Sequence, residues 1–209
     1  MALCRVFLIL GMLQYLLFGK RIIIKVLRNH PMAQVKIPSS DKIAEYKEMV
    51  YNRHPNLHDV WCTMDGLKIT LEQSGDALVQ EQYYNGWTHD HYVSSVICFC
   101  PDGTIPIVFV NVPGAVHDSQ IADYGNIYDK LEFVYESHIE DRQERGVARD
   151  ATSMRQCAEW GMRAFQSSMP CIKDRMKFET RGERKVTLIM MILLFNTECC
   201  ERILTAPSA

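Results

Sequence analysis

The segment VWCTMDGLKITL, residues 60–71, decides the fold because apolar and polar side chains alternate along it. A period of two is the signature of a half-buried β-strand. It places on one face the side chains of Trp61, Thr63, Asp65, Leu67, Ile69 and Leu71. Asp65 is the only charged residue on this more apolar face, and a carboxylate held away from water is unfavourable unless a partner compensates it. We therefore predict a strand in which Asp65 needs such a partner.

An alternative interpretation concerns the dipeptide Asp65-Gly66. The pair is also a turn signal, so Asp65 could end the strand and keep its carboxylate in water. The sequence leaves both interpretations open.

Composition favours one globular unit with an uneven charge distribution. The chain has 209 residues, 47% hydrophobic and 23% charged, with a formal net charge of -2. Residues 1–40 carry six bases and no acid, residues 41–140 carry five bases against sixteen acids, and residues 141–209 carry twelve bases against nine acids. An acidic centre disfavours a nucleic-acid contact there and suits divalent cations, although a solvated acidic surface fits equally well.

The cysteines and the N-terminus bear on the cellular compartment. The eight cysteines show no C-x-x-C spacing and no His/Cys ligand spacing, which predicts a reduced, intracellular protein without structural zinc. The apolar run from Val6 to Phe18 is too short for an ordinary membrane span, and no small-residue cleavage site follows it. We expect an N-terminal helical segment over residues 1–54 and no membrane partner. A signal peptide or anchor at residues 1–19 remains the alternative.

Further elements surround the opening strand. We predict helices over residues 1–30 and 41–52, the latter capped by Ser39 or Ser40, and a polar loop over residues 72–90. Strands follow over residues 91–100 and 104–112, joined by the turn Pro101-Asp102-Gly103, and Pro106 indicates an edge position or a bulge. Three strands with these short links predict an antiparallel three-strand meander within an α/β fold.

The C-terminal half is predicted to be helical with one interruption. Apolar residues recur at helical spacing over residues 121–131, although Gly125 weakens this prediction. A charged linker is expected over residues 137–150, then a helix over 151–168 capped by Asp150 or Thr152. Residues 186–195, VTLIMMILLF, are apolar all round and predict a core helix.

Three acids lie where acids are locally unexpected: Asp65, Asp118 and Glu159. Carboxylates that converge from separate elements can bind Mg²⁺ or Mn²⁺, and such ions can activate water for phosphoryl displacement. Each acid also has an ordinary interpretation. Asp118 could cap the following helix, and Glu159 could form exposed ion pairs with Arg155 or Arg163, each four residues away.

Four motifs in order carry a resemblance: MDGLKI, QYYNGWTHDHYVSSVICFCPDG, PGAVHDSQIA and ATSMRQCAEWGMRAFQ. Together they resemble the DDE superfamily endonuclease domain of PIF/Harbinger-type transposases. The resemblance implies an RNase H-like domain over residues 55–205, Mg²⁺- or Mn²⁺-dependent cleavage of DNA, and a nuclear location. By position, Asp65 resembles the first metal-binding Asp of this family and Glu159 the final Glu.

The chain departs from the family at the second metal-binding Asp. The family places this Asp at the end of a fourth, central strand, whereas residues 128–154 contain no apolar run after Tyr135 and no matching Asp. The central fourth strand is therefore expected to be missing. Asp118 belongs to the HDS motif and is kept as a weak third ligand.

These departures give two functional hypotheses. The first is a truncated, transposon-derived DDE endonuclease-like protein whose metal-dependent DNA cleavage is weak or lost. The second is a non-enzymatic descendant that binds DNA or a protein partner. Lys20, Arg21, Lys25 and Arg28 could contact phosphate or form a solvated helix face.

Overall fold

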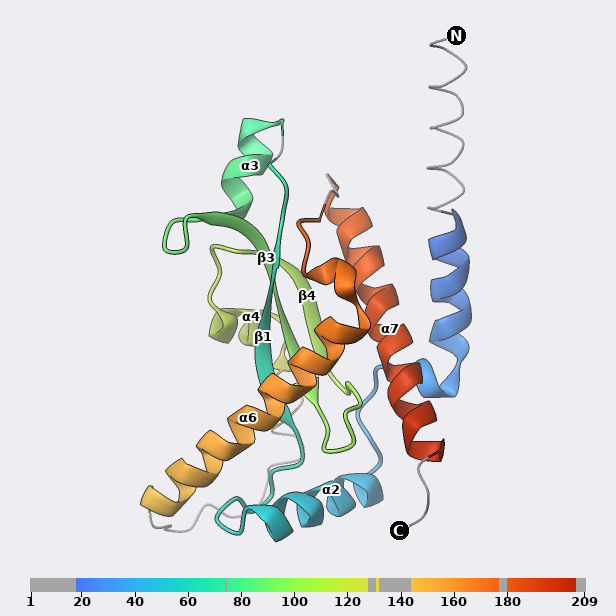
Figure 1. Cartoon of the computed structure of the whole chain (residues 1–209), viewed down its shortest axis with the longest axis vertical. Coiled ribbons are helices and arrows are strands. Elements are labelled where there is room, and N and C mark those ends of the chain that lie inside the picture. Colours follow the sequence, from blue (N-terminus) through green and yellow to red (C-terminus); the bar gives the residue numbers. More distant parts are fainter. Residues whose placement is uncertain (1–17, 74, 128–130, 132–143, 177–179, 206–209) are drawn as a thin grey trace.

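A computed structural model of the chain describes residues 18–73, 75–127, 131, 144–176 and 180–205. The predicted α/β character is confirmed, since a small antiparallel sheet packs between helices (Figure 1).

The sheet is built around strand β3. β3 spans Asp90–Phe99 and pairs antiparallel with β1, Thr63–Thr70, and with β4, Val108–Pro113. A short strand β2, Tyr84–Asn85, also pairs with β3. β1, β3 and β4 form the predicted antiparallel meander, and Asp65 lies opposite Ile97 within β1. The turn interpretation of Asp65-Gly66 is therefore wrong.

Helices cover both faces of the sheet (Figure 1). Helix α6, Glu144–Ser168, runs obliquely across β1, and α7, Arg181–Thr205, lies beside it on the same face. Helices α2, Ser40–Arg53, and α4, Asp118–Tyr124, cover the opposite face. β3 is almost entirely buried because its side chains contact both layers.

The core under α6 and α7 follows from the alternation in β1. Leu67 and Ile69 pack with Ile97, Met162 and Phe165 in one cluster. Burying each large side chain contributes about 1.5–3 kcal/mol, so this face supplies much of the driving force for folding.

Helix α6 lies close to the sheet at Gly161. A Cβ atom at this position would lie 2.8 Å from Cγ and 2.9 Å from Cδ1 of the Phe99 ring. Phe99 is buried and pairs with Thr63 of β1, so its ring has little room to move. The absence of a side chain at Gly161 therefore sets the distance between α6 and the sheet.

We predict that Gly161→Ala destabilises the protein although alanine is the better helix former. Overpacking against Phe99 costs about 1–3 kcal/mol, against a helix-propensity gain of about 1 kcal/mol. We expect a net loss of about 1 kcal/mol in urea unfolding. Gly182→Ala in α7, where a Cβ meets no atom within 4 Å, is the control and should be neutral or stabilising. Equal stability of the two variants would contradict the close approach.

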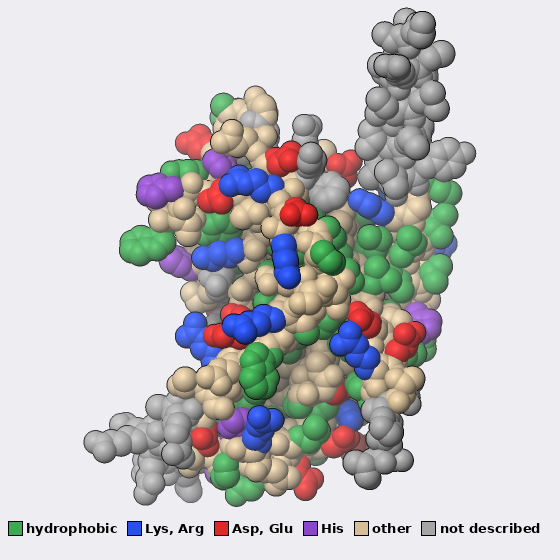
Figure 2. Space-filling model, in the orientation of Figure 1, with side chains coloured by type: hydrophobic (Ala, Val, Ile, Leu, Met, Phe, Trp, Pro, Cys, Tyr) green, Lys and Arg blue, Asp and Glu red, His purple; other side chains and the backbone are tan. Residues whose placement is uncertain are grey.

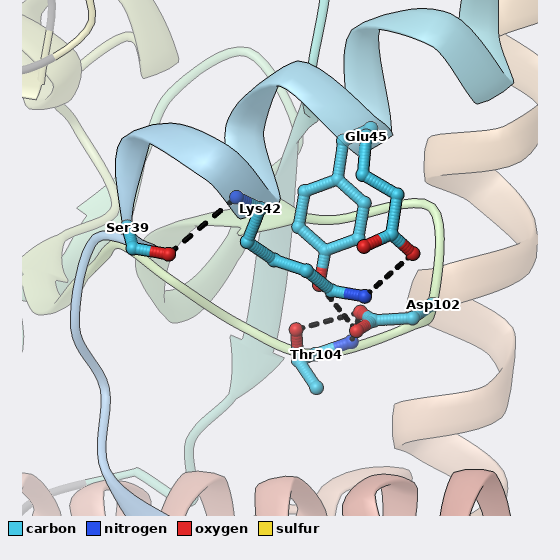
Figure 3. A network of polar contacts seen from close by, with 6 residues as sticks. Ser39, Lys42, Glu45, Asp102 and Thr104 are labelled. Atoms are coloured by element: carbon cyan, nitrogen blue, oxygen red, sulfur yellow. Dashed lines mark hydrogen bonds and ion pairs between the residues drawn. The ribbon is translucent and has the colours of Figure 1, made fainter.

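A polar network fixes α2 to the turn between β3 and β4 (Figure 3). The buried Tyr46 hydroxyl donates to Asp102 Oδ2, while the amide and hydroxyl of Thr104 donate to Asp102 Oδ1 at 2.9 and 2.7 Å. Burial and the neighbouring Asp102 raise the pKa of Tyr46 well above its ordinary value. The folded state therefore strongly favours the neutral phenol.

Tyr46→Phe should lower the unfolding free energy at pH 8 by about 1–3 kcal/mol, because Asp102 loses a buried donor. The unfolded-state tyrosine ionises near pH 10, below the folded-state pKa, so this contribution is present below pH 10 and is lost as the pH rises above it. Chemical denaturation of both proteins should show their difference shrinking between pH 8 and about pH 11. A difference that stays constant would contradict the role of the phenol proton.

Asn196 attaches α7 to the chain segments beneath it. Its side chain accepts from the amide of Ile105 at 2.8 Å and donates to the carbonyls of Ile105 at 3.1 Å and Gln34 at 3.3 Å. Asn196 is buried, and these bonds satisfy backbone groups that precede β4. They hold α7 against the sheet.

Several predicted elements are confirmed with shifted bounds. The helix over 41–52 is α2, with the Ser39 side chain as its cap, and the core helix over 186–195 is the middle of α7. The strand over 104–112 begins only at Val108, and its bulge lies opposite β3 between Ser94 and Val96. Pro106 precedes the strand, and the described part of the chain pairs β4 only with β3, which fits the expected edge position.

Three predictions about elements are wrong. The loop over 72–90 contains helix α3, Ala77–Tyr83, capped by Asp76, as well as β2. The linker over 137–150 ends earlier because α6 begins at Glu144, so neither Asp150 nor Thr152 is a cap. The helix predicted over 121–131 is interrupted because α4 ends at Tyr124, with Gly125 as its C-cap.

The N-terminal part of the described chain is a helix over residues 18–29, which packs on α7. Ile24 and Leu27 contact Leu193, and Lys20 Nζ donates to Thr187 Oγ1 at 3.2 Å. The predicted helical run and possible signal segment before residue 18 lie outside the described residues. No helix in the described ranges has the length and apolarity needed to cross a membrane.

Candidate functional site

Asp65 lies on the sheet face that α6 covers. It shares this face of β1 with Leu67 and Ile69, and its cross-strand neighbour Ile97 belongs to the same core cluster. The side chain is half-buried, and Oδ1 accepts a hydrogen bond from the amide of Gly66 at 2.8 Å. Partial exposure to water and this hydrogen bond offset part of the free-energy cost of placing the Asp65 carboxylate on an apolar face.

The Gly66 amide lies on the open side of β1. The Leu71 amide donates to His91 in β3 at 2.8 Å, so the backbone groups of odd-numbered residues face β3 and those of even-numbered residues face away. Within the described ranges, the open side is paired only near Leu71, where Met176 donates to Thr70 at 2.9 Å and accepts from Glu72 at 3.2 Å. The Asp65 carboxylate thus lies at an edge of the sheet that ligands or another segment can approach.

Glu159 lies on α6 but on its exposed side. The sheet-facing side of the helix carries Met154, Ala158, Met162 and Phe165, which are buried. Glu159 is exposed, as its ordinary interpretation requires, but the ion pairs of the described residues include none with Arg155 or Arg163. The Glu159 side chain is therefore in contact with solvent.

Asp118 is the first residue of α4, and His117 occupies the N-cap position. Its side chain lies outside what the structure describes. α4 covers the face of the sheet opposite to α6. The backbone therefore places Asp118 on an element of the other layer from Glu159.

Within the described residues, no three His, Cys, Asp or Glu side chains gather closely enough to hold a metal ion. A cation held by Asp65 and Glu159 would need further ligands from water, from substrate phosphates or from groups outside these residues. Two carboxylates supply oxygen ligands of the right kind for a hard cation, but fewer than such a cation needs.

A hollow of about 380 Å³ lies between α2, the start of β1, the turn after β3 and α6. Thr63 lies on its β1 side, and Trp160 and Gly161 lie on its α6 side. Neither Asp65 nor Glu159 lines the hollow. Basic and acidic side chains are interspersed over this face of the molecule (Figure 2).

Some buried polar residues were not predicted from the sequence. Asp150, within α6, accepts from the amide and side chain of Asn56 at 3.2 and 2.9 Å. Arg184 in α7 donates to Asn111 at 3.2 Å and lies 4.4 Å from the ring centroid of Tyr83. Burial lowers the pKa of Arg184. The only sequence signal for Arg184 is a basic residue at helical spacing from an apolar run, which usually marks an exposed position.

All seven cysteines in the described part of the chain are free thiols. Burial raises the pKa of the Cys100 thiol to about 12, and hydrogen bonding with Cys98 together with burial raises the pKa of the Cys62 thiol. Thiols with raised pKa values are poor nucleophiles and poor metal ligands at neutral pH. Cys62 and Cys100 act as packing residues.

Comparison with known families gives one match. The model of the DDE superfamily endonuclease family matches residues 64–143, which include β1 with Asp65, the meander and α4 with Asp118. The match ends before α6, so it does not extend to Glu159. No curated protein and no solved structure shows significant similarity to the chain. The family resemblance is thus supported at the level of the DDE superfamily endonuclease domain.

Proposed function

We propose that the chain is a transposase-derived, DDE endonuclease-like protein whose ancestral chemistry is divalent-metal-dependent cleavage of DNA, weak or lost in this chain. The observation that carries the proposal is the family match over residues 64–143, with Asp65 on the first strand of the meander. DDE endonucleases generally depend on a divalent metal and act on DNA. The PIF/Harbinger subtype, the RNase H-like fold, the domain bounds 55–205 and a nuclear location are parts of the same proposal.

The proposed site places one acid on each of two packed elements. Asp65 faces the α6 layer, and Gly161, two residues after Glu159, contacts Phe99 opposite Thr63. Asp65 and Glu159 would be the principal oxygen ligands of Mg²⁺ or Mn²⁺, with Asp118 a weaker third. Such an ion supplies charge that activates water and stabilises an in-line phosphoryl displacement.

The missing fourth strand is proposed to explain weak activity. In the described part of the chain, the open side of β1 pairs only with Met176 near Leu71. A strand paired along the rest of this edge would bring a further acid close to Asp65. Without such an acid, a hard cation loses both an oxygen ligand and negative charge, so we expect weak metal binding.

Mn²⁺ should stabilise the wild-type chain but not Asp65→Asn. A ligand that binds only the folded state at ten times its dissociation constant adds about 1.4 kcal/mol to the unfolding free energy. Urea unfolding with and without Mn²⁺ measures this difference. Glu159→Gln should reduce the metal-dependent gain, whereas Glu201→Gln, an exposed acid on α7, should retain it. Equal metal-dependent stabilisation of wild type and Asp65→Asn would contradict the proposed site.

DNA cleavage is tested separately with supercoiled plasmid and Mn²⁺. We expect slow nicking by the wild-type chain and at least a tenfold lower rate for Asp65→Asn. The Glu201→Gln variant should match the wild type. Nicking that persists unchanged in Asp65→Asn would assign the activity to a contaminant or to another site.

The exposure of Glu159 favours a second candidate function. In this alternative, the chain keeps the scaffold and binds DNA or a protein partner without cleaving DNA. It predicts no nicking under any metal condition, while the variants fold as stably as the wild type.

A further inference from the structure

A groove of about 710 Å³ lies away from the candidate acids, between β4, α7, the helix over residues 18–29 and the segment around Lys36. Its size falls within the range of about 300–1,000 Å³ that is usual for ligand clefts. Hydrophobic side chains also gather on the molecular face along helix 18–29 and α7 (Figure 2). The groove is therefore large enough for a short peptide segment.

The groove follows the backbone edge of β4. Five consecutive residues, Val108–Val112, line it, and consecutive strand residues point to opposite faces. A groove over one face of the strand would contact only alternate residues, so the groove must run along the edge of β4 to be lined by all five. The Ile107 carbonyl accepts from Cys98 at 3.0 Å, so the backbone groups of Val108 and Val110 point away from β3. No described residue hydrogen-bonds these outward groups, and an added strand would pair with them.

The floor of the groove is apolar. Ile189, Ile192 and Leu193 of α7 line it together with the valines of β4. The bulge at Asn111 ends the regular edge, and Asn111 Nδ2 donates to the Arg181 carbonyl at 2.8 Å. The groove therefore offers a short strand edge beside an apolar surface, which suits a few extended residues.

The rim is basic. Four exposed cations line the groove, namely Arg28, Lys36, Arg181 and Lys185, and none of the lining residues is acidic. The ion pairs of the described residues include none of these four. The α7 N-terminus at Arg181 adds a positive partial charge. The positive charge of the rim therefore favours binding of a negatively charged ligand.

Charge also decides between possible occupants. A second copy paired through β4 would bring two basic rims together, which is repulsive. Duplex DNA would meet the cations but leave the apolar floor and strand edge uncovered, since its exterior is phosphate. We propose that this groove binds an extended segment of a partner protein that alternates acidic and apolar residues. This proposal is independent of the proposed nuclease function.

Fluorescence anisotropy of the full chain with a labelled peptide of alternating glutamate and valine tests the proposal. We expect saturable binding that weakens with added salt, because the rim contributes charge attraction. A peptide with lysine in place of glutamate, and a glutamate–valine peptide with N-methylated backbone, should each bind at least tenfold more weakly. Equal binding of the lysine peptide would overturn the charge argument, and equal binding of the N-methylated peptide would overturn strand addition.

Charge reversal on the rim locates the site. The double variant Arg181→Glu with Lys185→Glu should weaken peptide binding at least tenfold, and acids near the α7 N-terminus favour the helix, so the variant is expected to fold. Lys173→Glu, an exposed reversal outside the lining, should leave the affinity within about twofold, as expected for distant sites. Unchanged affinity in the double variant, displacement of the peptide by duplex DNA, or no peptide binding at all would each overturn the proposal.

Discussion

The close approach of α6 to the sheet at Gly161 is the constraint on which the rest of the structure depends. It is possible only because this position has no side chain and the Phe99 ring fills the space. The approach seals the core formed by Leu67, Ile69 and Phe165. It also sets Glu159, two residues earlier, relative to Asp65 on the strand below. Packing in the core and the geometry of the candidate site are thus coupled.

The meander and the core helices could be predicted because their signals are local. Alternation in residues 60–71, the mainly apolar stretch over residues 91–100 and the turn at Pro101-Asp102-Gly103 define β1, β3 and their partner β4. The all-apolar stretch at residues 186–195 required a buried helix. In each case the hydrophobic pattern and the tertiary environment agree.

The errors arose where tertiary contacts override local signals. Asp150 has the chemistry of a helix cap, yet it lies inside α6 and is satisfied by Asn56, a residue far away in sequence. The charged stretch from residue 144 is helical although its pattern indicated a linker. The basic groove could not be predicted, because Arg28, Lys36 and Arg181 come from segments that only the fold brings together.

The two candidate sites use different edges of one sheet. Asp65 lies beside the open side of β1, whereas the groove runs along β4 on the far side of β3. The carboxylate of Asp65 suits a cation, and the basic rim of the groove suits an acidic peptide. A partner bound at β4 would therefore leave the candidate acids accessible.

The central claim is that Asp65 holds a divalent cation on the α6 side of β1. A crystal structure of the full chain with Mn²⁺, with anomalous diffraction recorded at the manganese edge, tests it most directly. We expect an anomalous peak at about 2.0–2.6 Å from an Asp65 oxygen, the range of hard-cation ligands, with Glu159 turned toward it. A fully occupied peak elsewhere, or no peak while Asp65 remains bonded only to the Gly66 amide, would contradict the account.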